Sequence, residues 1–262
     1  MGKSNLLESV EFISQLKSFR AVNDKDLIKY DEGQSTISAI VDFNHNIKIE
    51  ISRQGSKKVY LNDCILKKQS LVKNYLRSVC FSSNDINIVR SEPNFRRVWL
   101  DKVVAQLEPV YVELLGRYSK LLKQRSHYWR SSISKEHSSS TLIDSYDSQL
   151  ALIGTRIFRR RKRALIKLQP YIEFWHNHLS KSKENIGLKF ISSLQSLDEN
   201  DDESTIMDLF TGKLIAQRDL EELTGKCSVG PHRDDIEFCI NNFSVRKFGS
   251  SGQQRTLTLA LK

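Results

Sequence analysis

Two short segments near opposite ends of the chain carry residue types that suit phosphate binding. Gly2, Lys3 and Ser4 stand directly before an amphipathic segment and match the last three positions of the pattern G-x-x-x-x-G-K-[ST]. In that pattern, backbone N–H groups at a helix N-terminus hold an anion, the lysine reaches the terminal phosphates and the hydroxyl binds magnesium. Three residues alone favour the simpler interpretation, a solvated lysine beside a serine helix cap.

The second segment, residues 249–255, begins Gly-Ser-Ser-Gly and leads into an apolar run. Ser250, Gly252 and Gln253 are placed where a helix is expected to begin, so small residues and unpaired N–H groups would let an anion approach. A serine cap with a flexible glycine is again the simpler interpretation. Taken together with the lysine segment, this second helix N-terminus favours a nucleotide as the ligand.

Positive charge is concentrated between these two segments. Residues 156–163 hold six basic side chains and no acid. On a helix they extend over about 12 Å and predict salt-sensitive, sequence-independent binding of DNA phosphates. The alternative is a solvated helix face, or charges balanced by acids on a neighbouring helix. The six are Arg156, Arg159, Arg160, Arg161, Lys162 and Arg163.

The composition narrows the class of protein. The chain has 262 residues, of which 39% are hydrophobic, enough for one large domain or two ordinary ones. Its net charge is 41 − 31 = +10, which favours a polyanionic partner.

The four cysteines form no C-x-x-C pair and the six histidines show no metal-ligand spacing, so we expect a reducing cytoplasm and no structural zinc. No apolar stretch approaches the roughly 20 residues that span a bilayer, and no signal segment is recognisable, so membrane-spanning and secreted classes are excluded.

The N-terminal part is predicted to mix helix and strand. Apolar spacing predicts a helix over residues 5–17. Alternation predicts a hairpin of strands 37–43 and 47–51 around a turn at 44–46, extended by a strand at 59–61. A short buried strand is expected at 79–81.

From Pro93 onward the spacing predicts long helices. Two of them, joined by a polar connection at residues 131–140, are expected to form an antiparallel hairpin, with Pro170 breaking or kinking the second. The acidic run 198–203 predicts a surface loop leading into a helix. Beyond it we expect a strand at 236–240 with a tight turn at Asn241 and Asn242.

Five sequence blocks resemble the RecF family of bacterial DNA replication and repair proteins, which belongs to the SMC/Rad50-like branch of the ABC ATPases. They follow that family's order and cover essentially the whole chain. The resemblance implies an α/β fold, an ABC-type ATPase head with an inserted arm of long helices. Residues 1–92 and 204–262 would form the lobes of the head and 93–203 the arm. The blocks are GKSNLLES, FSSNDINIV, RRVWLD, GPHRDDIEFCINN and GSSGQQRTLTLALK.

The resemblance also implies roles for both phosphate-binding segments. Gly2, Lys3 and Ser4 would be the surviving phosphate-loop residues, with Ser4 in the place of the family's usual threonine and able to ligate Mg²⁺. The second segment resembles the ABC signature, which closes over an ATP held by the other protomer of a head-to-head dimer. ATP and Mg²⁺ are the implied cofactors, and a homodimer formed on ATP binding is the implied assembly. The signature positions are Ser250, Gly252 and Gln253.

By resemblance, the function is ATP-dependent DNA binding in recombinational repair and replication. The partners would be single-stranded, gapped or junction DNA together with RecR, RecO and RecA, with no membrane.

The family's ATPase is weak. The chain looks like a fragment that starts inside the phosphate loop and ends before the Walker B acids, so no catalytic residue is assigned. The alternative is a basic helical module that binds nucleic acid without nucleotide control. His232, Arg233, Asp234 and Asp235 suit either catalysis or an internal salt-bridge network.

Overall fold

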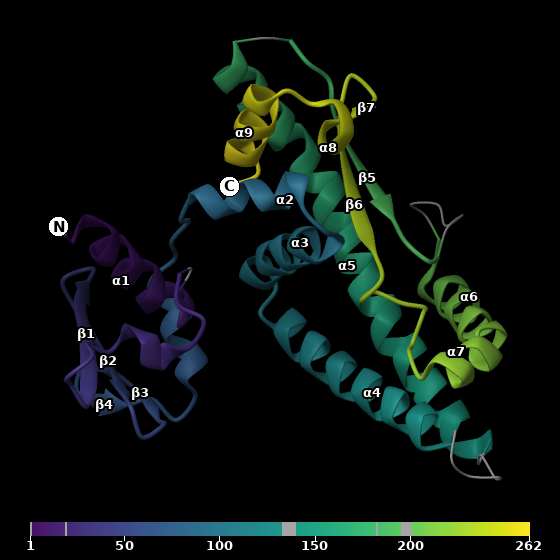
Figure 1. Ribbon diagram of the computed structural model, residues 1–262, viewed down its shortest axis with the longest axis horizontal. Coiled ribbons are helices and arrows are strands. Elements are labelled where there is room, and N and C mark those ends of the chain that lie inside the picture. Colours follow the sequence, from purple (N-terminus) through teal and green to yellow (C-terminus); the bar gives the residue numbers. More distant parts are fainter. Residues whose placement is uncertain (1, 19, 133–139, 182, 195–200) are drawn as a thin grey trace. The chain divides into compact units, whose positions relative to one another are not determined.

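The structure is a computed structural model, and it describes residues 2–18, 20–132, 140–181, 183–194 and 201–262. Residue contacts divide the chain into two compact units, one of residues 1–82 with Lys262 and one of residues 83–261 (Figure 1). Residues 83–92 pack within the second unit, whereas the family resemblance assigns them to the first lobe. The three-part functional division stays a prediction.

The first unit packs one helix on a small antiparallel sheet. Helix α1 (Lys3–Gln15) is followed by strands β1 (Gln34–Val41), β2 (His45–Ser52), β3 (Lys57–Leu61) and β4 (Cys64–Ile65), which pair in that order. The strands alternate as predicted, so that Ile49 lies between Ile37 on β1 and Val59 on β3. Phe12 and Ile13 of α1 belong to the same buried cluster as the β2 isoleucines.

Two details of this unit differ from the prediction. The first hairpin turns at Asp42 and Phe43, both with positive φ, and Val41 pairs with His45, so strand β1 ends two residues earlier than its apolar pattern indicated. Phe43 is 98% exposed because it occupies the turn. The strand predicted at residues 79–81 is wrong: Val79 and Phe81 are exposed, and these residues pair with no strand in the described part of the chain.

The second unit is built along one long helix. Helices α2 (Asn87–Arg90), α3 (Pro93–Leu107) and α4 (Val110–Ser132) precede α5 (Ser140–Ser180), and α5 contacts α3, α4, α6 (Glu203–Ala216) and α9 (Ser251–Ala260). The predicted pairing of two long helices is confirmed by α4 and α5 (Figure 1). Residues 133–139 of the predicted connection lie outside the described residues.

Sequence signals explain where several of these helices begin and end. Pro93 occupies the first turn of α3, where a missing N–H costs nothing, and Pro109 follows its last turn. Of the predicted break or kink at Pro170, the break is wrong, since α5 continues through this residue. Pro170 lies on the exposed face, where water can satisfy the carbonyl that it leaves unpaired. Asp202 caps α6, accepting a hydrogen bond from the Thr205 N–H at 2.8 Å.

A three-stranded antiparallel sheet lies beside α5. Its order is β5 (Ile186–Ile191), β6 (Asp235–Ile240) and β7 (Phe243–Ser244), and the short helix α8 (Val245–Phe248) follows β7 in the chain. Strand β6 and the turn at Asn241 and Asn242, both with positive φ, confirm the prediction. Strand β5 was not predicted, although Ile186, Leu188 and Phe190 alternate. Helix α7 (Arg218–Thr224) lies between α6 and β6 in the chain.

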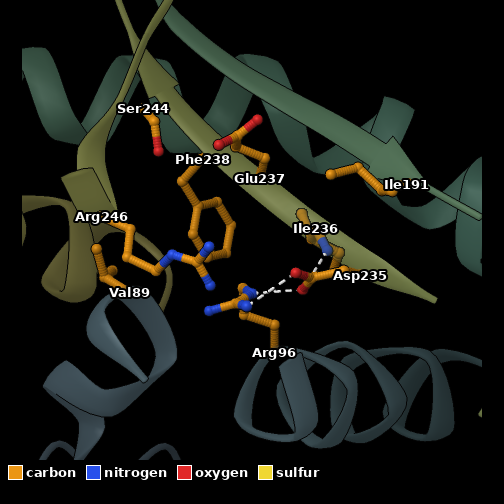
Figure 2. Close-up of a pocket in the computed structure, with 9 residues that line it drawn as sticks. All are labelled: Val89, Arg96, Ile191, Asp235, Ile236, Glu237, Phe238, Ser244 and Arg246. Atoms are coloured by element: carbon orange, nitrogen blue, oxygen red, sulfur yellow. Dashed lines mark hydrogen bonds and ion pairs between the residues drawn. The ribbon is translucent and has the colours of Figure 1, made fainter. Parts of the chain in front are cut away.

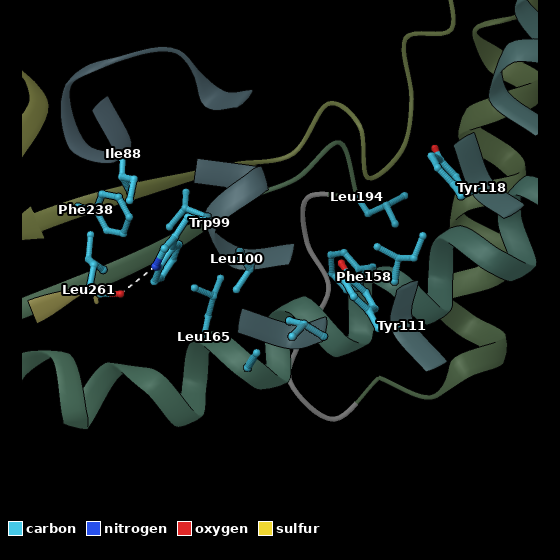
Figure 3. Close-up of a cluster of buried hydrophobic side chains, with 14 of the residues drawn as sticks. Ile88, Trp99, Leu100, Tyr111, Tyr118, Phe158, Leu165, Leu194, Phe238 and Leu261 are labelled. Atoms are coloured by element: carbon cyan, nitrogen blue, oxygen red, sulfur yellow. Dashed lines mark hydrogen bonds between the residues drawn. The ribbon is translucent and has the colours of Figure 1, made fainter. Parts of the chain in front are cut away.

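The core of this unit joins helices and sheet (Figure 3). Trp99 of α3 meets Phe238 of β6 edge-on, with ring centroids 5.8 Å apart, and its Nε1–H donates to the carbonyl of Leu261 at 2.9 Å. Burying the indole without that acceptor would leave a donor unpaired. One side chain therefore fixes α3 against both the sheet and the end of α9.

Among the described residues, no helix combines the length and the apolar character needed to cross a bilayer. All four cysteines lie in the described part, and none of them forms a disulfide.

A pair of glycine substitutions tests the packing of α5 against α6. We expect Gly154→Ala to lower the free energy of unfolding by about 1–3 kcal/mol, because the added Cβ overlaps the fully buried ring of Phe210. Gly116→Ala on α4 is the control, since its Cβ meets no atom within 4 Å, and it should stabilise by up to about 1 kcal/mol through helix propensity. Urea unfolding measures both changes. Equal effects of the two substitutions would contradict this packing.

Candidate nucleotide-binding site

The first candidate site is the N-terminus of α1. Gly2 has φ 117°, a backbone conformation that side-chain-bearing residues rarely adopt, and it caps the helix with no side-chain hydrogen bond. The residues 2–7 are all exposed. The first turn contains no acidic residue. Its backbone N–H groups therefore point to solvent without a carboxylate that would compete with an anion.

The donors at this end fit a triphosphate. Lys3 and Ser4 add an ammonium and a hydroxyl to the amide row, and a Cβ on Gly2 would meet nothing within 4 Å, so the approach to the amides is open. Amides, one lysine and one hydroxyl bind phosphate oxygens, and the hydroxyl is also a hard ligand that suits Mg²⁺. In the described part of the chain, no three histidine, cysteine or acidic side chains gather as a metal site of their own.

The second candidate site is the N-terminus of α9, in the other compact unit. Ser250 is the N-cap and its Oγ accepts from the Gln253 N–H at 3.2 Å. The Gln253 Oε1 accepts from the Ser250 N–H at 2.9 Å, completing a capping box. Ser250, Ser251 and Gly252 are exposed, so the serine-cap interpretation and an anion-binding role are compatible here. Gln253 is only partly exposed, and its side chain is engaged inside the protein.

The predicted basic strip on α5 is divided by the structure. Arg156 and Arg159 are exposed and both pair with Glu203 of α6, at 3.2 and 2.7 Å. Arg160 and Arg163 both pair with Glu108, which follows α3. The alternative of charges balanced by neighbouring acids thus describes these four residues, and it also describes Arg161, which pairs with Asp101 and Asp234. Lys162 is partly buried.

The pairs with Arg160 and Arg163 change the pKa of Glu108. Partial burial would raise the pKa of Glu108, but the hydrogen bonds from Arg163 and Arg160 lower it overall. Arg156, Arg159 and Arg163 remain about half exposed, with side-chain exposures of 46%, 46% and 54%. They keep donors for an external phosphate because each guanidinium has five N–H groups.

Arg161 is a correction to the predicted strip. Its side chain is buried, at 3% exposure for the residue, and it cannot reach a phosphate on the surface. Its guanidinium donates to both carboxylate oxygens of Asp101 at 2.9 and 3.0 Å, to the Pro231 carbonyl at 2.6 Å and to Asp234 at 3.2 Å. Arg161 faces inward because it lies four residues after Ile157 and four before Leu165, on the buried face of α5, so helical spacing could have separated it from the rest of the strip.

Comparison with known proteins gives one consistent relationship. No family model matches the chain. Over its full length, the chain is 43% identical to the DNA replication and repair protein RecF of Synechococcus sp. (strain CC9605), and 42% identical to that of Parasynechococcus marenigrum (strain WH8102), and it covers 72% of each. Two solved structures of the recombination mediator protein RecF in the RecFOR pathway, one with ATP and one with ATPrS, are 29% identical, with TM-scores of 0.90 and 0.89. The chain covers 70% of each of these structures.

The chain belongs to the RecF family. The predicted fold class, an ABC-type ATPase head with inserted long helices, is confirmed by the two RecF structures. The family resemblance drawn from the five sequence blocks is confirmed as well.

In this RecF-family chain, the GPHRDD block is an internal network. Asp235 receives two hydrogen bonds from Arg96 of α3, at 2.6 and 2.9 Å (Figure 2). Asp234 accepts from Ser192 Oγ at 2.7 Å and from Arg161. Burial raises the pKa of Asp234 to about 6, although Arg161 and the Ser192 hydrogen bond counteract it. Asp234 and Asp235 thus belong to a network of internal salt bridges, whereas His232 and Arg233 bind the Cys227 carbonyl.

His232 of the same block is held neutral. Its Nε2 lies 3.1 Å from the Cys227 carbonyl, which only accepts, so Nε2 carries the proton and Nδ1 accepts from the Tyr118 hydroxyl at 3.0 Å. Burial lowers the pKa of His232 to about 4, with the hydrogen bond to Cys227 opposing the shift. A protonated ring would lose the hydrogen bond from Tyr118.

The lowered pKa predicts a stability difference that depends on pH. Below about 6.5 the unfolded chain takes up a proton on His232, whereas the folded protein does so only near 4, so the wild type loses stability as pH falls through this window. Between pH 7 and 4.5 we expect His232→Gln to lose about 2 kcal/mol less than the wild type. Because Asp234 titrates in both proteins, the difference isolates His232. Parallel stability curves from denaturant unfolding would contradict the shift.

Proposed function

We propose that this chain binds ATP and magnesium and that the nucleotide controls a DNA-binding homodimer in replication and recombinational repair. The observation that carries the proposal is the open N-terminus of α1, with Gly2 at positive φ and Lys3 and Ser4 exposed beside it. The relatives support it, since they are DNA replication and repair proteins and the similar structures include one with ATP.

Each segment has a separate task in this proposal. The α1 amides and Lys3 would hold the β- and γ-phosphates, and Ser4 would ligate the Mg²⁺ that accompanies them. The exposed N-terminus of α9, with Ser250 and Gly252, would approach the γ-phosphate of a nucleotide held by a second copy. ATP supplies the charge that bridges the two copies, so the dimer is expected to depend on it.

DNA would be bound by the exposed arginines of α5. Arg156, Arg159 and Arg163 lie on one helix with their side chains about half exposed. Glu203 and Glu108 pair with them in the structure. Exposed pairs of this kind are worth at most about 1 kcal/mol, so a phosphate backbone can compete for the same donors.

We further propose single-stranded, gapped or junction DNA as the ligand, and a role beside RecR and RecO in RecA loading. A cytoplasmic location and a weak ATPase belong to the same proposal.

Two substitutions test the nucleotide part in the full-length protein. We expect Lys3→Ala to weaken ATP binding by roughly 100-fold or more, because it removes charge-assisted hydrogen bonds to phosphate. Ser250→Arg should leave ATP binding intact and abolish the ATP-dependent dimer, because a bulky cation blocks the α9 N-terminus. Equilibrium dialysis measures the first effect and sedimentation in ATP and magnesium the second.

Controls separate these effects from misfolding. Lys17→Ala removes an exposed lysine just beyond the other end of α1 and should bind ATP normally. Ser250→Asp keeps a good helix cap but places negative charge toward the phosphates, and it should also fail to dimerise. Wild-type ATP affinity in Lys3→Ala, or ATP-dependent dimers of both Ser250 variants, would refute the site. A wild type that binds DNA with no response to nucleotide would favour the basic helical module instead.

The DNA part is tested by salt dependence. We expect Arg156→Ala/Arg159→Ala to weaken DNA binding and to lower the slope of log affinity against log salt by between about 1 and 2, as for two lost phosphate contacts. Lys120→Ala/Lys123→Ala is the matched control, because it removes two exposed charges at the same spacing on α4. Fluorescence anisotropy over a salt series measures both. An equal loss in the control would assign the effect to net charge alone.

A further inference from the structure

A hydrogen-bonded chain connects the end of α5 to the cap of α9. The Gln253 Nε2–H donates to Glu184 Oε1 at 2.8 Å. Glu184 lies between α5 and β5, far from Gln253 in sequence, and its side chain is 18% exposed. Gln253 is the same residue whose Oε1 and backbone N–H close the capping box with Ser250.

The chemistry of Glu184 fixes which way the Gln253 amide points. A carboxylate only accepts hydrogen bonds, so the Gln253 NH₂ must face Glu184 and the Gln253 Oε1 must face the Ser250 N–H. A flipped amide would place two acceptor oxygens together and would leave Ser250 N–H without its partner. With the amide fixed, Ser250 Oγ accepts from the Gln253 N–H and keeps its own proton to donate outward.

Hydrogen bonds also hold the backbone around Glu184. Its backbone N–H donates to Asn177 Oδ1 at 3.0 Å, and its Oε2 lies 3.5 Å from Nδ1 of His176, a side chain of α5 with no exposed surface. The next residue, Asn185, exchanges two hydrogen bonds with Asn241 in the turn between β6 and β7. The contact with His176 is not a hydrogen bond, so the carboxylate is positioned by the Glu184 backbone and by the hydrogen bond from Gln253.

We propose that Glu184 is a positioning residue for the nucleotide. By fixing the Gln253 amide, it makes the N-terminus of α9 present the Ser250 hydroxyl proton and the Ser251 and Gly252 amides to a phosphate. This inference rests on the proposed function, which supplies the nucleotide as the ligand. Glu184 lies outside both of the segments proposed to bind phosphate. Glu184 touches no phosphate itself and acts through Gln253.

The experiment compares three variants in the full-length protein. Glu184→Ala removes the acceptor. Glu184→Gln retains an oxygen that accepts from Gln253 and is the conservative variant. Glu173→Ala is the control, because Glu173 lies near the same end of α5 and accepts a hydrogen bond from the Ile186 N–H rather than from α9. ATP-dependent dimerisation is measured by sedimentation, ATP binding by dialysis, and backbone amide exchange of Gln253 and Leu261 by NMR.

We expect Glu184→Ala to weaken the ATP-dependent dimer by about tenfold, the size of one hydrogen bond to a charged group, with ATP binding to the α1 site unchanged. Exchange of the Gln253 amide should accelerate by a similar factor, while that of Leu261, at the other end of the same helix, stays constant. Glu184→Gln should retain most of both properties. A general loss of stability would instead accelerate both amides together.

The outcomes separate this inference from the proposed function. Wild-type dimerisation and Gln253 exchange in Glu184→Ala would overturn the role of Glu184, as would equal losses in Glu173→Ala. If the wild type forms no dimer with ATP, the proposed function fails and so does the nucleotide role. The exchange of Gln253 still decides in that case whether Glu184 holds the cap.

Discussion

The buried guanidinium of Arg161 is the interaction on which the second unit depends. It joins Asp101 of α3 and Asp234, which precedes β6, to the middle of α5, and Tyr111 of α4 lies 3.1 Å from its Nε. A buried charge is costly unless it is paired and hydrogen-bonded, and removing one partner from such a cluster costs about 3–5 kcal/mol. The relative positions of these elements are therefore fixed by the geometry of one planar group.

A second arginine acts in the same way farther along α4. Arg125 has no exposed surface, and it donates to Asp147 of α5 at 2.7 Å and to Glu221 of α7. Burial would lower the pKa of Arg125, but Asp147 and Glu221 raise it overall. Apolar contacts along α4 and α5 are compatible with several sliding registers of two long helices, whereas a forked ion pair accepts only one. The ion pairs of Arg161 and Arg125 thus set the register in which α4 and α5 pack.

The two candidate phosphate sites are helix N-termini that are capped in different ways. At α1, Gly2 provides backbone geometry and leaves the amides open. At α9, Ser250 and Gln253 satisfy one amide each and leave those of Ser251 and Gly252 in the exposed first turn, where no intrahelical partner exists. A cap of this kind stabilises the helix and still retains an anion-binding face, so the structural and functional interpretations of Ser250 do not compete.

Local patterns in the sequence determined most of the helices, the main hairpins and the two helix N-termini proposed to bind phosphate, because spacing, capping residues and turn residues act over a few neighbours. Tertiary structure alone decided the rest. Within one run of six basic residues it gave Arg161 the carboxylates of Asp101 and Asp234, and it paired Arg156, Arg159, Arg160 and Arg163 with Glu203 and Glu108, since these acids lie on other segments of the chain. It likewise brought Glu184 to Gln253. No short-range pattern encodes such contacts, because their free energy comes from groups that meet only after the chain has folded.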